Sequence, residues 1–99
     1  MATDNISIGD DVLISWNVQM LDSDHHKIYN ETNTIINKNK PINIQKRVWI
    51  CSNVSLLKGA NIPKNSIVGS GSIVNKSFKD ENILIINNEI KKKNILWKS

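Results

Sequence analysis

The sequence predicts an all-β fold, a parallel β-helix of about three coils built from six-residue repeats. Two observations predict it. Aliphatic residues recur every six positions, a period that fits neither an amphipathic helix nor an alternating strand. The fifth position of most repeats is small or β-branched, which suits short strands around a narrow core. The first set is Ile8, Ile14, Met20, Ile44, Ile50, Leu56, Ile62, Val68 and Val74, and the second is Val12, Val18, Val48, Val54, Ala60 and Ser66.

The order of the elements follows from this period, because three hexads make one triangular coil of about eighteen residues. We expect a single domain over residues 1–99, with a first coil at 1–20, an excursion loop at 21–43, later coils at 44–78 and a C-terminal cap or tail at 79–99. The excursion loop is polar and rich in asparagine, and solenoid loops of this length are commonly functional. Residues 87–97 are expected to form a short helix. An antiparallel β-sandwich with evenly spaced strands remains the alternative.

The net charge of +4 comes largely from lysines near the C-terminus, at positions 91, 92, 93 and 98. We interpret them as a solvated basic tail and expect no nucleic-acid partner. Cys51 is the only cysteine, so no disulfide can form within the chain, and the cytoplasm is the simplest compartment. No apolar run is long enough to span a membrane, and the first residues lack the order of a signal peptide.

Several runs of the sequence resemble the hexapeptide-repeat acetyltransferases, in particular the sugar, galactoside and maltose O-acetyltransferases. These are Ile8-Gly9-Asp10-Asp11-Val12-Leu13-Ile14-Ser15-Trp16-Asn17-Val18 followed by Asp22-Ser23-Asp24-His25-His26, then Val48-Trp49-Ile50-Cys51-Ser52-Asn53-Val54, Leu57-Lys58-Gly59 and Ile67-Val68-Gly69-Ser70-Gly71-Ser72-Ile73-Val74-Asn75-Lys76. They cover roughly residues 6–78 in the family's order. The resemblance implies a left-handed β-helix, a homotrimer with sites between subunits, and transfer of an acetyl group from acetyl-CoA to a hydroxyl or amine, often of a sugar.

The resemblance also implies roles for individual residues. A histidine of the excursion loop acts as general base in the family, and we favour His26 over the adjacent His25, with Asp22 or Asp24 as an orienting carboxylate. Ser52, Ser70, Asn75 and Lys76 match positions that line the CoA channel, although each could instead be a corner residue. Asn17 and Asp24 match acceptor-side positions, and Trp16 borders them. For Trp49, packing is the expected role.

The chain departs from the family pattern at both ends. Relatives carry further coils before the position of Met1, so the chain looks N-terminally truncated. Near the other end, relatives carry a turn with glycine and proline that closes over CoA, whereas residues 85–91 contain neither. Without these residues the same backbone path is harder to adopt.

Three functions therefore compete. The first is an acetyltransferase using acetyl-CoA and no metal, and the second is a catalytically inactive β-helix module that only oligomerises or binds a partner. The third is a zinc enzyme of the γ-carbonic anhydrase type, which needs several converging histidines. His25 and His26 are the only histidines and are adjacent, so no metal site is expected.

Overall fold

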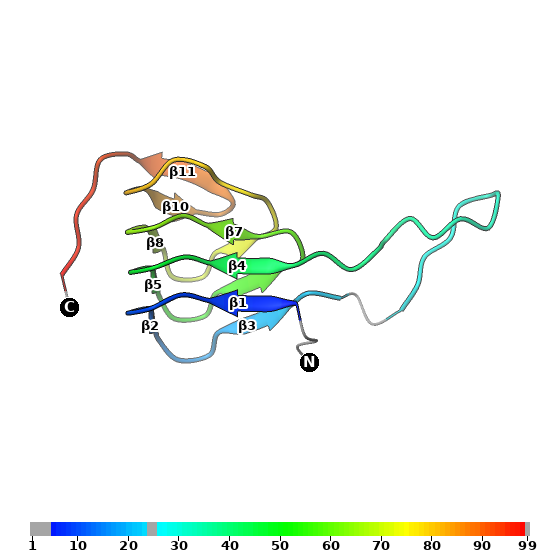
Figure 1. Ribbon diagram of the computed structural model, residues 1–99, viewed down its shortest axis with the longest axis horizontal. Coiled ribbons are helices and arrows are strands. Elements are labelled where there is room, and N and C mark those ends of the chain that lie inside the picture. Colours follow the sequence, from blue (N-terminus) through cyan, green and yellow to red (C-terminus); the bar gives the residue numbers. More distant parts are fainter. Residues whose placement is uncertain (1–4, 24–25, 99) are drawn as a thin grey trace.

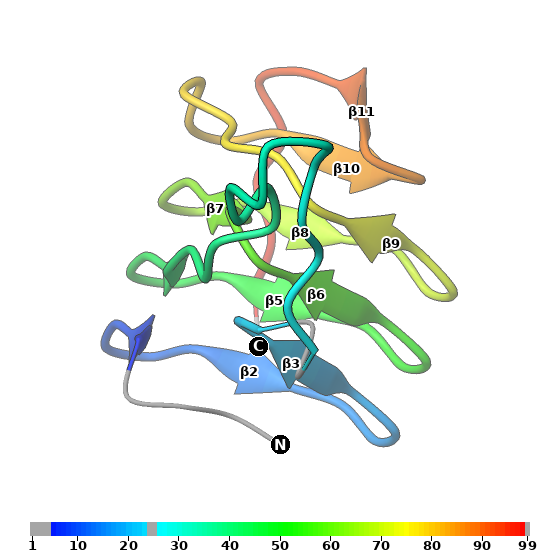
Figure 2. The same cartoon turned by 90° about the vertical axis from the view of Figure 1, so that its right-hand side faces the viewer.

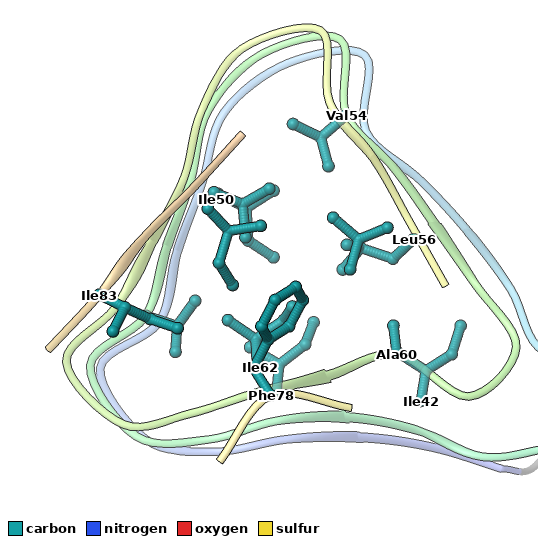
Figure 3. Packing of buried hydrophobic residues seen from close by; sticks show 13 residues of the cluster. Ile42, Ile50, Val54, Leu56, Ala60, Ile62, Phe78 and Ile83 are labelled. Carbon is teal, nitrogen blue, oxygen red and sulfur yellow. The ribbon is translucent and has the colours of Figure 1, made fainter. Parts of the chain in front are cut away.

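The computed structural model describes residues 5–23 and 26–98, and it shows parallel strands stacked in three sheets that form the sides of a triangular prism (Figures 1 and 3). Each coil contributes one strand to each sheet. The first coil is β1 (Ile6–Ile8), β2 (Leu13–Ile14) and β3 (Gln19–Leu21), the second is β4 (Ile42–Ile44), β5 (Trp49–Ile50) and β6 (Ser55–Leu57), and the third is β7 (Asn61–Ile62), β8 (Ile67–Val68) and β9 (Ile73–Val74). The chain then begins a fourth coil with β10 (Leu84–Ile86), which pairs with β11 (Glu89–Lys92).

Sheet A has the order β1-β4-β7, sheet B the order β11-β10-β8-β5-β2, and sheet C the order β3-β6-β9. The register follows the predicted repeat, since Ile44 pairs with Ile62 and Ile50 with Val68, in each case eighteen residues further on. Ile8 pairs with Ile44, because an eighteen-residue excursion is inserted between the first two coils. The all-β prediction is thereby confirmed.

The predicted ladder points into the prism and forms its core (Figure 3). In the second and third coils both predicted sets are buried. Branched aliphatic side chains fill this narrow space because they stack directly on equivalent side chains of the next coil. The buried apolar residues are Ile42, Ile44, Val48, Ile50, Val54, Leu56, Ala60, Ile62, Val68, Val74, Phe78, Ile83 and Ile85.

The corners of the prism are turned mainly by asparagine. Among the described residues, six residues other than glycine have positive φ at the corners, and four of the six are asparagines. They are Asp11, Asn17, Arg47, Asn53, Asn65 and Asn82. Asparagine adopts the left-handed conformation at lower cost than most residues because its side chain bonds locally to the backbone. The corners therefore need few glycines, although Gly59 and Gly71 occupy two of them with φ of 87° and 76°.

The C-terminal helix predicted for residues 87–97 is wrong, because this segment begins with an antiparallel hairpin. β10 joins the edge of β8, and the chain reverses through Asn87 and Asn88, whose φ angles are 50° and 67°. Two successive residues with positive φ make the two-residue turn that suits a twisted hairpin. The edge of β8 provides backbone hydrogen-bond partners for an incoming strand. A short isolated helix has no such external partners and is only marginally stable.

After β11 the chain returns along the outside of sheet B as a strap, residues 93–98, that ends near β5 (Figure 1). Ile95 N donates to Asn82 O at 2.9 Å. Trp97 holds the far end: its Nε1 donates to Arg47 O at 3.0 Å, and Arg47 Nη2 donates to Trp97 O at 2.8 Å. The Trp97 ring also lies 5.9 Å from that of Trp49. Trp49 therefore packs against Trp97, which agrees with its expected packing role.

Candidate active site

One corner of the prism stacks three of the predicted site residues. The loops between sheets B and C form a column, seen at the right of Figure 2, in which Asn53 N donates to Trp16 O at 3.2 Å and Gly71 N donates to Ser52 O at 3.1 Å. Asn17 lies in the lowest loop, Ser52 in the middle one and Ser70 in the highest. We call this stack the BC corner.

The BC corner is held together by its own polar side chains. Asn17 Nδ2 donates to Asn53 Oδ1 at 2.6 Å, and both residues have φ near 60°. Ser52 is buried, whereas Asn17 and Ser70 are exposed. The column therefore presents two predicted site side chains to solvent on a backbone that hydrogen bonds fix from coil to coil.

Cys51 lies beside this column and is half-buried. Burial raises the pKa of the Cys51 thiol above its ordinary value of 9.0, and hydrogen bonds with Ser70 oppose the rise without cancelling it. A thiol with a raised pKa is a weak nucleophile near neutral pH, because little of it is thiolate. The structure thus gives Cys51 the character of a packing residue at this corner.

The other two predicted CoA residues lie at the opposite end of sheet C. Asn75 and Lys76 follow β9 and stack on the corner at Gly59, where Asn61 N donates to Lys76 O at 3.3 Å. Lys76 is exposed, and its Nζ lies 5.5 Å from the centroid of the Phe78 ring. We call this stack the CA corner.

A hollow of about 390 Å³ opens beside the CA corner, lined by Lys76, Ser77, Phe78, Lys79, Asp80, Glu89 and Ile90. Two lysines and an aromatic ring are suitable groups for a phosphate-bearing, aromatic ligand. Two carboxylates line the same hollow, however, and Asp80 is paired with Lys93 at 3.4 Å. The hollow therefore has mixed charge.

Asn75 is already engaged by the C-terminal hairpin. Its N–H donates to Asn88 Oδ1 at 3.0 Å, and Asn88 Nδ2 donates to Asn75 Oδ1 at 2.7 Å. Asn87 N donates to Ser72 Oγ at 3.1 Å beside them. The Asn87-Asn88 turn thus closes over the end of sheet C.

The excursion between β3 and β4 leaves the prism at the CA corner and projects from it as a long arm (Figures 1 and 2). Its outer part is a small hairpin, in which Tyr29 bridges Ile35 and Ile36 N donates to Ile28 O at 2.8 Å. His26 lies near the start of the arm and is exposed. The other predicted loop residues, Asp24 and His25, lie outside the described residues.

Asn37 fixes the backbone on which His26 sits. Asn37 Nδ2 donates to His26 O at 2.7 Å, and Asn37 Oδ1 accepts from Ile28 N at 2.5 Å. One amide side chain therefore joins the outgoing and returning halves of the arm. No local sequence pattern marks Asn37, because its role depends on a contact with a residue eleven positions away.

Asp22 lies at the neck of the arm and is fully buried. Its Oδ2 accepts from Asn5 N at 3.2 Å, and its backbone oxygen accepts from Lys40 N at 3.3 Å. A buried carboxylate that accepts from a backbone N–H group is a strong structural tie. These bonds give Asp22 a part in closing the arm, whereas its role as an orienting carboxylate stays a prediction.

The structure separates the predicted residues into two groups. Asn17, Ser52 and Ser70 share the BC corner, while Asn75, Lys76 and the arm that carries His26 belong to the CA corner. Asp22 lies five positions after Asn17 along an extended chain, a span of about 16 Å at about 3.3 Å per residue. From Asp22 the arm extends away from the prism (Figure 1). The arm that carries His26 therefore leaves the prism at a different corner from the BC corner of the same chain.

A three-sided parallel β-helix with a polar corner column and a histidine-bearing arm is the architecture that the resemblance to the hexapeptide-repeat acetyltransferases implies. In sequence, the chain is similar to a Schizosaccharomyces pombe protein named as an acetyltransferase, with 34% identity over 80 residues that cover 81% of this chain and 39% of the relative. It is also similar to the galactoside O-acetyltransferase of Escherichia coli, with 41% identity over 78 residues that cover 74% of this chain and 36% of the relative. No family model matches the chain.

Two solved structures have the same fold. The polysialic acid O-acetyltransferase OatWY matches with a TM-score of 0.91 and 39% identity over 95% of this chain and 46% of its own. The polysialic acid-specific acetyltransferase NeuO matches with a TM-score of 0.78 and 28% identity over 95% of this chain and 53% of its own. The predicted resemblance and the left-handed β-helix are thereby confirmed. The chain spans only about two fifths of the length of the curated relatives.

Proposed function

We propose that the chain forms part of an O-acetyltransferase that moves an acetyl group from acetyl-CoA to a hydroxyl of a sugar-like acceptor. The observation that carries the proposal is the stacked BC corner, in which Ser52 and Ser70 are in register and Asn17 lies in the adjacent loop, in a chain similar to galactoside and polysialic acid O-acetyltransferases. Ser52, Ser70, Asn75 and Lys76 are proposed for acetyl-CoA, and Asn17 and Asp24 for the acceptor. Cytoplasmic location is part of the proposal, and free Cys51 supports it.

In the proposed reaction, His26 is the general base and His25 is the alternative. The neutral imidazole takes the proton of the acceptor hydroxyl as its oxygen attacks the thioester carbonyl. The tetrahedral intermediate then expels the CoA sulfur, which receives the proton from the imidazolium. The products are an acetyl ester and free CoA. Asn37 supports this role because it holds the backbone at His26.

The separation of the two corners supports a homotrimer with sites between subunits. Since the arm that carries His26 leaves the prism at a different corner from the BC corner, a site that uses both takes the arm of a neighbouring copy. The arm is suited to reach one, because it projects from the prism (Figure 1) and exposes Ile28, Tyr29 and Ile36 by 52%, 53% and 59%. Exposed apolar side chains on a projecting segment favour a protein contact.

The test of catalysis is turnover of acetyl-CoA with methyl galactoside and with short α-linked sialic acid oligomers as acceptors. We expect His26→Ala to lower kcat by about 10²- to 10⁴-fold. Lys38→Ala, on the same arm, is the matched control and should leave kcat unchanged. If His25→Ala abolishes turnover and His26→Ala does not, the base is His25. Absence of turnover with either acceptor class would reject the proposed reaction for these substrates.

The test of the shared site is complementation. Chains with His26→Ala and chains with Asn17→Ala are each expected to be inactive. When the two are unfolded together and refolded, mixed trimers contain some sites in which both residues are intact, so part of the activity returns. Recovery of no activity, despite mixed trimers in native mass spectra, would place the whole site within one chain.

A module without catalysis is the second candidate, and the C-terminal turn favours it. Asn88 occupies both the N–H and the side-chain oxygen of Asn75, one of the proposed CoA residues. Calorimetric titration of acetyl-CoA into the protein separates the two. Saturable binding of acetyl-CoA by the wild-type protein supports the enzyme. If the wild type does not bind acetyl-CoA and Asn88→Gly does, the turn blocks the channel.

A further inference from the structure

The outer part of the arm between β3 and β4 holds its own shape (Figure 1). Ile36 N donates to Ile28 O at 2.8 Å across the small hairpin. At the tip, Asn30 Oδ1 accepts from Thr32 N at 2.9 Å, from Thr34 N at 3.0 Å and from Thr32 Oγ1 at 2.8 Å. An asparagine side chain that takes up nearby N–H groups stabilises a turn by local contacts. The hairpin is therefore formed by contacts between its own residues.

The other end of the arm is closed at its neck, where Lys40 N donates to Asp22 O at 3.3 Å. His26 lies between the neck and the hairpin, and it is exposed. Because it is exposed, packing against the coils does not hold its backbone in place. A hydrogen bond to the backbone of His26 itself can have this effect.

Asn37 makes that bond, and it makes a second one with the other end of the same amide. Its Nδ2 donates to His26 O at 2.7 Å, and its Oδ1 accepts from Ile28 N at 2.5 Å. One partner is a carbonyl and the other an N–H group, so a single orientation of the amide satisfies both. The two bonds tie the backbone at His26 to the start of the hairpin.

We propose that Asn37 is the positioning residue of the proposed general base. Its donor bond to His26 O directs the imidazole, and its acceptor bond to Ile28 N maintains the root of the hairpin. This inference rests on the proposed acetyl transfer. It applies whether the base is His26 or His25, because the two are consecutive in the chain. A displacement of about 1 Å at a reacting group can lower a rate by about 10²-fold.

Asn37→Asp separates the two bonds. The carboxylate has nearly the same size and still accepts from Ile28 N, but it has no proton to donate to His26 O. We expect kcat to fall about 10-fold while KM for acetyl-CoA stays unchanged. The two proteins are compared on the high-pH plateau of kcat, where the base is neutral in both. Asn39→Asp adds the same charge at an exposed position of the arm and should keep the wild-type kcat.

A double variant shows whether Asn37 acts through the histidine. Once the essential histidine is replaced by alanine, no imidazole remains to be positioned, so Asn37→Asp should lower the residual activity no further. We expect His26→Ala with Asn37→Asp to equal His26→Ala alone, and the same pair with His25→Ala applies if His25 is essential. A residue that only stabilises the arm would lower the residual activity again.

Hydrogen exchange at Ile28 N tests the acceptor bond without turnover. Protection of this amide should be retained in Asn37→Asp and lost in Asn37→Ala. Absence of turnover by the wild type rejects the proposed function, and the positioning role with it. Turnover by the wild type together with an unchanged kcat in Asn37→Asp, or an additive loss in the double variant, overturns the positioning role alone. Loss of protection at Ile28 N in Asn37→Asp overturns the division of work between the two bonds.

Discussion

At the scale of single residues, left-handed backbone conformations at the corners determine where this chain can turn. Asn17 and Asn53 occupy equivalent positions in two coils, each with φ near 60°, and their side chains bond to one another. The resemblance predicts Asn17 as an acceptor-side residue, whereas its place at the corner is a finding of the structure. Asn53 was not predicted to belong to the site, although it stands 36 residues after Asn17, at the same place in the repeat.

A substitution at Asn53 tests the cost of this conformation. We expect Asn53→Val to lower the free energy of unfolding by about 2 kcal/mol, because a β-branched residue is strained at positive φ. Asn53→Gly accepts this φ and should lose less than about 1 kcal/mol, the contribution of the hydrogen bond to Asn17. Denaturant titration gives both values.

The control is Asn43→Val. Asn43 is exposed on the outer face of β4, where valine suits the extended backbone. Its stability should match wild type. Equal losses at Asn53 and Asn43 would mean that side-chain polarity, and not backbone conformation, makes asparagine necessary.

At the scale of elements, the sequence predicted the strands of the coils better than it predicted the C-terminal segment. Strands at a fixed spacing repeat the same environment, so several weak signals reinforce one another. Residues 87–97 have no such repeat, so nothing in the pattern argued against a short helix there. Asn87-Asn88 between Ile85-Ile86 and Glu89-Ile90 was in fact a hairpin signal. The helix prediction was wrong because β10 pairs with the edge of β8, and this contact belongs to the tertiary structure.

The hairpin turn gives a prediction in which two effects separate. Asn88→Gly keeps the positive φ and removes the two side-chain bonds to Asn75, which should cost about 1–2 kcal/mol. Asn88→Ala removes the same bonds and adds backbone strain, so we expect a further loss of about 1 kcal/mol. Thermal unfolding of both variants measures the difference. Glu89→Ala, in the same hairpin, should have no comparable effect, and identical losses for Gly and Ala would show that the turn is unstrained.

The strap gives a second prediction at this scale. Trp97→Ala removes a ring that packs on Trp49 and a hydrogen bond to Arg47, and we expect a loss of about 2 kcal/mol. The fluorescence of Trp49 should shift to longer wavelength as solvent reaches it. Leu96→Ala is a close control, because the neighbouring Leu96 is 86% exposed. A strap that stays in place without Trp97 would leave the Trp49 emission unchanged.

At the scale of the whole molecule, the period of the sequence determined the architecture, while the site depended on contacts that the period does not encode. The ladder specifies which coil lies above which. The division of the predicted site between two corners, the bonds of Asn37 to the arm and the burial of Asp22 all follow from the excursion, where the repeat stops. The roles of His26, Ser52, Ser70 and Lys76, and the single domain over residues 1–99, remain predictions.

The arm can be removed to test whether it supports the prism. We replace residues 27–37 by a short glycine linker and keep Asp22 and Lys40, whose bond closes the neck. Because the apolar side chains of the arm are exposed, the midpoint of thermal unfolding should change little, and a shorter loop lowers the entropy of closure by less than about 1 kcal/mol. Acetyl transfer should be lost. A large drop in thermal stability would show that the arm packs on the coils.

The eighteen-residue register between the second and third coils has a consequence for length. Each coil contacts only its neighbours, so a duplicated copy of residues 42–59 inserted after Gly59 should fold as one more coil and raise the prism by about 4.8 Å. The register falls to seventeen residues between Val68 and Ile85, where the hairpin begins to close the stack. The distance along the prism between the arm at the first coil and the hollow beside β11 can therefore change only by whole coils. The length of a ligand that contacts both must match a whole number of coils.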